Sequence, residues 1–69
     1  MTLEEALNKA AGELPEGCTI AVIVENGAGW VECSDADGSV QSLDQPDATM
    51  AEQVIAHLDL MKEGAASDI

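Results

Sequence analysis

The chain contains no arginine, tyrosine or phenylalanine, and it has a single tryptophan and a single histidine. Only two lysines oppose fourteen acidic residues within its 69 residues, so the formal net charge is −12. A chain this acidic cannot displace counterions from phosphates, and we expect it to bind neither nucleic acid nor anionic membranes. The charge favours a basic protein surface as the partner, and it also keeps a small protein in solution.

Long apolar runs are missing too, since none approaches the ~18 residues that a membrane-spanning helix needs. The opening stretch MTLEEALNK has neither the basic nor the apolar region of a secretory signal. We therefore expect a cytoplasmic protein in which Cys18 and Cys33 are free thiols. Their expected diagonal placement on paired strands separates the alpha carbons by about 7–8 Å, which exceeds the usual span of a disulfide.

The sequence offers no catalytic or metal-binding constellation. Cys18, Cys33 and His57 are its only soft ligands, fewer than the four that structural zinc takes. Asp35 and Asp37 begin like a calcium loop, but the later ligand positions of that loop are not acidic. We expect a protein that is not an enzyme and that uses no cofactor or metal.

The first segment has the periodicity of a helix from Thr2 to Leu14. Thr2 and Glu5 have the spacing of a capping box, in which each side chain binds a free backbone N–H at the helix start. Pro15 cannot continue the backbone ladder and ends the helix. The expected apolar stripe consists of Leu3, Ala6, Leu7, Ala10 and Leu14.

A second helix is expected from about Met50 to Glu63. Thr49 and Glu52 again form a capping box, and Gly64 is placed to cap the carboxyl end. Residues 65–69 are expected to form a frayed tail. The apolar stripe of this helix consists of Ala51, Val54, Ile55, Leu58 and Met61.

Between the helices, the β-branched run 18–25 predicts a strand. Asn26-Gly27 then predicts a two-residue hairpin turn with positive φ at both positions, which places Ile23 opposite Trp30. Side chains alternate along strands, so this register separates two faces. One face contains Ile20, Val22, Val24, Val31 and Cys33, and the other contains Ala21, Ile23, Trp30 and Glu32.

Residues 35–39, DADGS, predict a second tight turn, in which a type I turn is closed by a left-handed glycine. The short polar strand that follows would place Gln41 opposite Cys33 and Leu43 opposite Val31. Leu43 then joins the face of Val31, and Val40 joins the face of Trp30. A strand of this length and polarity suits a sheet edge.

These elements predict one α+β domain over residues 1–69, in the order αβββα. We expect a three-stranded antiparallel meander with both helices on the Val31 face, as a two-layer sandwich. The element order and the chain length resemble the double-stranded-RNA-binding domain family. That family holds RNA with a lysine cluster at the start of its second helix, where this chain has TMAEQ over residues 49–53. The resemblance therefore implies the scaffold and not RNA binding.

With both helices on one face, the opposite face of the sheet is predicted to be an exposed protein-interaction surface. The residues assigned to it are Trp30, Ile23, Ala21, Val40, Glu32 and Glu25. Tryptophan is the most favoured anchor in protein interfaces, and exposed apolar patches mark interaction sites. The expected function is thus a non-enzymatic, acidic protein-binding module.

In size and charge, the chain resembles the class of phage-encoded inhibitors and nucleic-acid mimics that occupy basic grooves of host proteins. Anti-CRISPR proteins are one example of that class. The resemblance implies a phage protein that acts as an inhibitor or a DNA mimic on a basic host protein. The alternative is a homodimer, in which the Trp30 face of one copy packs on that of the other.

Overall fold

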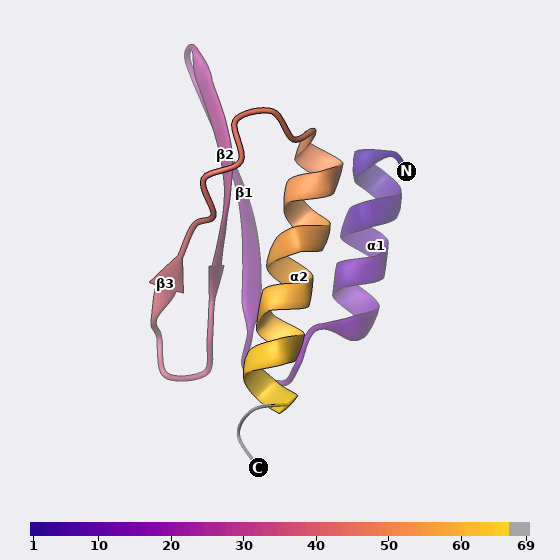
Figure 1. Ribbon diagram of the computed structural model, residues 1–69, viewed down its shortest axis with the longest axis vertical. Helices are drawn as coiled ribbons and strands as arrows, with labels where there is room; N and C mark the ends of the chain where they lie inside the picture. The colour runs from indigo at the N-terminus through magenta and orange to yellow at the C-terminus, as the bar shows by residue number, and fades with distance from the viewer. Residues whose placement is uncertain (67–69) are drawn as a thin grey trace.

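Residues 1–66 are described by the computed structural model, which has two helices and a three-stranded antiparallel sheet (Figure 1). The order is the predicted αβββα of an α+β fold, and the strands lie side by side as β1-β2-β3. The elements are α1 (Leu3–Glu13), β1 (Thr19–Glu25), β2 (Ala28–Ser34), β3 (Val40–Gln41) and α2 (Met50–Ala66).

Both helices begin with the predicted capping box. The Thr2 hydroxyl accepts a hydrogen bond from the Glu5 backbone N–H at 3.2 Å, and the Glu5 carboxylate accepts one from the Thr2 N–H at 2.8 Å. Thr49 and Glu52 repeat the pair at 3.1 and 2.8 Å. These exchanges satisfy backbone donors that the first helical turn leaves free. Local sequence is therefore enough to set where each helix starts.

The predicted end of the second helix is wrong. Helix α2 continues through Gly64 to Ala66 instead of stopping at Glu63. Gly64 does not have the left-handed conformation of a helix cap, since only Gly17, Gly27 and Gly38 have positive φ within residues 1–66. Glycine costs about 1 kcal/mol in a helix interior without breaking it. The remaining part of the predicted tail, residues 67–69, lies outside the described residues.

The register of the first hairpin is confirmed throughout, with Ile23 opposite Trp30 and Val22 opposite Val31. The turn itself differs from the expectation. Gly27 has a φ of 84°, but Asn26 does not have a positive φ. Positive φ at the second central residue alone is the signature of a type II turn. The two-residue length is what sets the register, and it is unchanged.

The second turn is confirmed. Gly38 has a φ of 88°, and the Asp35 carboxylate accepts hydrogen bonds from the backbone N–H groups of Asp37 and Ser39, each at 3.0 Å. Strand β3 pairs Gln41 with Cys33 as predicted, but it ends there. Leu43 does not pair with Val31, because the chain turns away from β2 after two residues of β3.

The core lies between α2, the sheet and α1. Helix α2 packs on β2 and β1, and α1 packs alongside α2 (Figure 1). The prediction that both helices lie directly on the Val31 face is not confirmed, since α1 has α2 as its main neighbour. Small side chains on α1 allow this close helix pairing. The buried core consists of Ala6, Ala10, Val31, Ala51, Val54 and Leu58.

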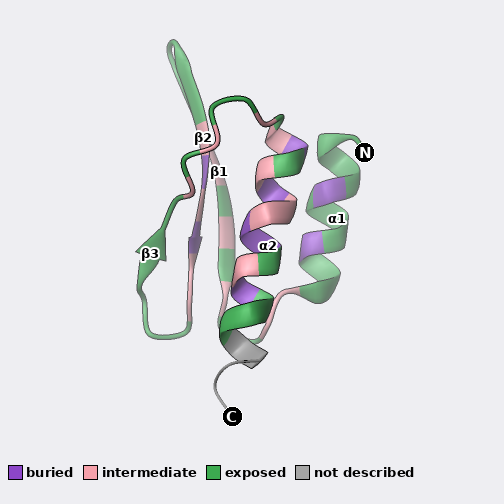
Figure 2. Ribbon diagram, in the orientation of Figure 1, coloured by how far each residue is buried: buried purple, intermediate pink, exposed green. Residues whose placement is uncertain are grey.

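Three predicted core residues are exposed instead (Figure 2). Leu3 and Leu7 of α1 keep 37% and 41% of their surface accessible, while Ala6 and Ala10 of the same stripe are buried. Val24 is 77% exposed, because the tip of the β1–β2 hairpin projects past the helices (Figure 1). Neither helix reaches the tip of the hairpin (Figure 1).

Candidate interaction surface

The face of the sheet opposite α2 contains the predicted interaction residues. Ile23 and Trp30 are direct cross-strand partners, and both are half-buried. Directly opposite residues on paired strands have beta carbons about 4.5–5.5 Å apart. The two side chains thus form one apolar unit in the middle of the hairpin.

A second group of residues lies on the same face of the sheet, farther from the tip of the β1–β2 hairpin. Ala21 is the cross-strand partner of Glu32, and both residues line a shallow cleft of about 100 Å³ with Val40, which is 64% exposed. Glu25 is exposed at the end of β1 and does not line this cleft. The structure therefore joins Ala21, Glu32 and Val40 and places Glu25 apart from them, near the hairpin tip.

Trp30 also borders a feature that the sequence did not predict. Because β3 stops at Gln41, the loop that follows runs beside the upper part of β2 and leaves a hollow of about 330 Å³. The hollow is lined by Gly29, Trp30, Ser42, Leu43, Asp44, Gln45, Pro46 and Gln53. One edge of the indole therefore faces a polar and acidic loop.

Two hydrogen bonds hold this loop against the rest of the fold. The Ser42 hydroxyl donates to the Val31 carbonyl at 2.7 Å. The Leu43 backbone N–H donates to Nε2 of His57 at 3.0 Å, while Nδ1 of the same ring lies 2.6 Å from the Gln53 carbonyl. These contacts together require the proton on Nδ1, because Nε2 must accept. The His57 side chain therefore supports the loop at a position that does not pair with β2.

His57 is completely buried, although it lies one position off the expected apolar stripe of the second helix. No sequence signal identified its partner, because Leu43 lies fourteen residues away in a loop. With both nitrogens bound to backbone groups, the ring anchors the loop beside Trp30. The ring therefore has a structural role.

The two lysine side chains gather at one place. Lys62 of α2 contacts the Glu13 carboxylate of α1 at 2.7 Å, and Lys9 approaches the same carboxylate at 3.9 Å. The hydrogen bond from Lys62 lowers the pKa of Glu13 below its usual value. Both lysines of the chain therefore serve one carboxylate where the helices meet, and the sheet carries acidic groups alone.

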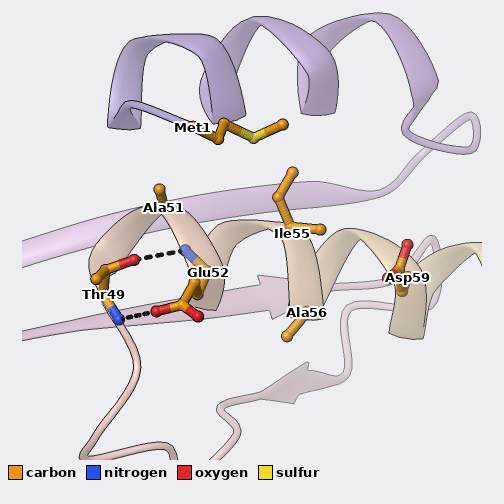
Figure 3. Close-up of a pocket in the computed structure, with 7 residues that line it drawn as sticks. All are labelled: Met1, Thr49, Ala51, Glu52, Ile55, Ala56 and Asp59. Atoms are coloured by element: carbon orange, nitrogen blue, oxygen red, sulfur yellow. Dashed lines mark hydrogen bonds between the residues drawn. The ribbon is translucent and has the colours of Figure 1, made fainter.

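Two further hollows lie away from the tryptophan, each of about 550 Å³. The first lies along α2 near Met1 and is lined by Thr49, Glu52 and Ile55, among others (Figure 3). Thr49 and Glu52 already bind each other in the capping box. The second is an acidic hollow at the opposite end of α2. Within residues 1–66, no cluster of histidine, cysteine or acidic side chains has the arrangement of a metal site.

The two cysteines are free and differ in environment. Cys33 is 2% exposed, and Cys18 is half-buried. Burial raises the pKa of the Cys33 thiol, which disfavours the reactive thiolate. None of the described helices is long and apolar enough to cross a bilayer.

A scan against protein-family models matched none, and searches of curated proteins and of solved structures likewise found no match. The surface chemistry described above therefore carries the functional argument.

Proposed function

We propose that this chain is a non-enzymatic protein-binding module that engages a basic partner through the Trp30 face of its sheet. The observation that supports this is the half-buried Ile23–Trp30 pair, which lies on the face opposite α2 with acidic groups around it. An aromatic anchor with a polar rim is the usual anatomy of a protein interface.

The charge distribution selects the class of partner. The two lysines pair with Glu13 near the helix ends, and the sheet face contributes Glu32 and Glu25. Like charges across an interface cost affinity, so an acidic partner is disfavoured. A basic groove that normally binds nucleic acid fits this chemistry, and the protein would then act as an acidic inhibitor of such a partner, of the kind that phages encode.

Self-association through the same face is the second candidate. The Ile23–Trp30 pair is apolar, and two copies stacked face to face would cover it. Against this stands the net charge of −12, which would double in the dimer and oppose close approach. The interaction with a basic protein therefore ranks first.

Sedimentation velocity and binding to a candidate basic protein separate the two. We expect a monomer that binds basic, nucleic-acid-binding proteins at low salt and loses them near 1 M salt, where the Debye length is about 3 Å. Trp30→Ala should weaken that binding by about 2 kcal/mol, roughly thirtyfold in Kd.

Val24→Ala is the matched control, because Val24 is an exposed apolar residue of the same hairpin on the other face. If Val24→Ala weakens the binding as much as Trp30→Ala does, the Trp30 face is not the binding site. A wild-type dimer that Trp30→Ala dissociates would instead establish self-association. Circular dichroism of each variant shows whether the fold is retained.

A further inference from the structure

The outer edge of β1 has backbone groups with no strand to bind. The two-residue turn makes Glu25 and Ala28 a hydrogen-bonded pair, and such pairs alternate along an antiparallel ladder. The backbone N–H and C=O groups of Ile20, Val22 and Val24 therefore point away from β2. Strand β1 ends the sheet, and no other segment within residues 1–66 hydrogen-bonds to this edge.

This edge lacks the usual protection against strand pairing. Natural sheets blunt an exposed edge with lysine, proline, a bulge or a very short strand. Strand β1 is seven residues long, TIAVIVE, and its only charge is Glu25 at the last position. The other edge, β3, is two residues long. Of the two edges, β1 is the one built to accept another strand.

Helix α1 extends the same site. Figures 1 and 3 both place α1 on the side of β1 that faces away from β2, beyond the edge of the sheet. Leu3, Leu7 and Leu14 lie within about 40° of one another around α1, given 3.6 residues per turn. Leu14 packs against the core, whereas Leu3 and Leu7 remain 37% and 41% exposed. These two leucines leave exposed apolar surface on α1.

A second copy of the chain does not fit this edge. Antiparallel pairing of two β1 strands about Val22 puts directly opposite residues on the same face of the joined sheet. Both sets of helices would then lie on one side, where α1 already projects past the edge (Figure 1). A single extended segment brings no helices and avoids this conflict.

We propose that the edge of β1 binds an extended segment of a partner protein as a fourth strand of the sheet. Residues of that segment opposite Ile20, Val22 and Val24 face α1 and should be apolar. Basic residues should flank the segment, because Glu16 lies three residues before β1 and Glu25 ends it, in a chain of net charge −12. The site is separate from the Trp30 face, so either can fail without the other.

The test uses the full chain and a synthetic peptide of alternating valine and threonine with lysines at both ends. Amide hydrogen exchange is followed by NMR at Ile20, Val22 and Val24. In the free protein these amides should exchange fast, while Ala21 and Ile23, which bind β2, are protected. Exchange slows by the factor 1 + [L]/Kd, so a peptide at ten times Kd should slow the three amides about tenfold.

A matched peptide with the same side chains but N-methylated at every residue should leave exchange unchanged, since it has no backbone N–H to donate to a strand edge. Val24→Pro removes an outward-facing donor without touching the β1–β2 ladder, and it should weaken the binding. Leu7→Glu should do the same from the α1 side. Trp30→Ala should not, and this separates the edge from the Trp30 face.

Three results would overturn the proposal. The first is failure of the peptide to bind at millimolar concentration, and the second is binding that does not slow exchange at the three amides. The third is concentration-dependent protection of these amides in the free protein, which would show that a second copy occupies the edge. Circular dichroism checks that each variant is folded. If Val24→Pro does not fold, Leu7→Glu still tests the site.

Discussion

The imidazole of His57 accepts a hydrogen bond from the backbone N–H of Leu43 at 3.0 Å, although the ring is completely buried and Leu43 lies in a loop. This bond holds the loop beside Trp30 where no strand ladder does. The buried His57 ring therefore helps to position the loop that borders Trp30 on the face of the sheet opposite α2.

Replacing His57 should loosen that surface. His57→Ala leaves the Leu43 N–H unsatisfied and opens a cavity, and we expect a loss of about 3 kcal/mol in the free energy of unfolding. Ser42→Ala removes only the hydroxyl bond to the Val31 carbonyl and should cost about 1 kcal/mol. Urea unfolding measures both, and the fluorescence of Trp30 should shift to the red in each folded variant. Equal losses in the two variants would contradict the anchoring role of His57.

The capping boxes should make stability depend on pH. Hydrogen bonds from the Thr49 backbone N–H and hydroxyl lower the pKa of Glu52 below its unfolded value. Its stabilising contribution is therefore complete above the unfolded pKa of about 4.3 and is lost as the pH falls through the lower folded value. Hydrogen bonds with Thr2 lower the pKa of Glu5 in the same way, so its contribution to stability has the same pH dependence.

Urea unfolding of wild type and Glu52→Gln across this pH range checks the expectation. The glutamine can still accept from the Thr49 N–H but does not titrate, so the difference between the two proteins should shrink at acidic pH. A difference that stays constant with pH would show that the Glu52 carboxylate does not contribute in this way. Thr49→Ala should cost about 1 kcal/mol as the loss of a helix cap.

The two cysteines should react at different rates. Burial and the raised pKa protect Cys33, while Cys18 is half-buried. With a thiol-alkylating reagent, mass spectrometry should show a singly labelled protein first, modified at Cys18. Labelling of Cys33 should follow the unfolding transition in urea. Simultaneous labelling of both thiols in the native protein would contradict the burial of Cys33.

Two glycines with the same backbone conformation should differ in their tolerance of alanine. Gly17 and Gly27 have φ of 85° and 84°. A beta carbon at Gly27 meets nothing within 4 Å, but one at Gly17 would lie 2.8 Å from the beta carbon of Ala36. Gly27→Ala should therefore cost only the left-handed strain of about 1–2 kcal/mol.

Gly17→Ala should cost more than Gly27→Ala, because it also pushes the loop before β1 against the β2–β3 turn. The double variant Gly17→Ala/Ala36→Gly removes the clash and should return the loss to that of Gly27→Ala. Thermal unfolding measures all three proteins. The absence of any recovery in the double variant would show that the contact with Ala36 is not the cause.

Much of the fold follows from short-range chemistry. Thr2–Glu5 and Thr49–Glu52 start the helices through contacts three residues apart. The two-residue turn after Glu25 determines the hairpin register. Alternation then places Ile23 and Trp30 on one face and Val31 on the other, so the face on which each of these side chains lies could be predicted.

Local patterns could not tell how far each apolar stripe would be covered. Leu3 and Leu7 matched the helical period as well as Ala6 and Ala10 did, yet only the alanines are buried. The small alanine side chains let α1 approach α2 closely, and this packing carries α1 past the edge of β1. Which residues of α1 are buried depends on whether this helix packs on α2 or on the sheet. No pattern within the sequence of α1 decides between these two neighbours.

Short-range rules were therefore sufficient for the helix starts, the second tight turn and the strand register. The caps and turns join residues that are close in the chain, and the length of each turn sets the strand pairing that follows it. Contacts between distant segments decided the rest. Glu13 meets Lys62 across 49 positions, and Leu43 meets His57 across fourteen. Such contacts exist only after the layers have packed, and they position α1, support the loop beside Trp30 and leave the edge of β1 open.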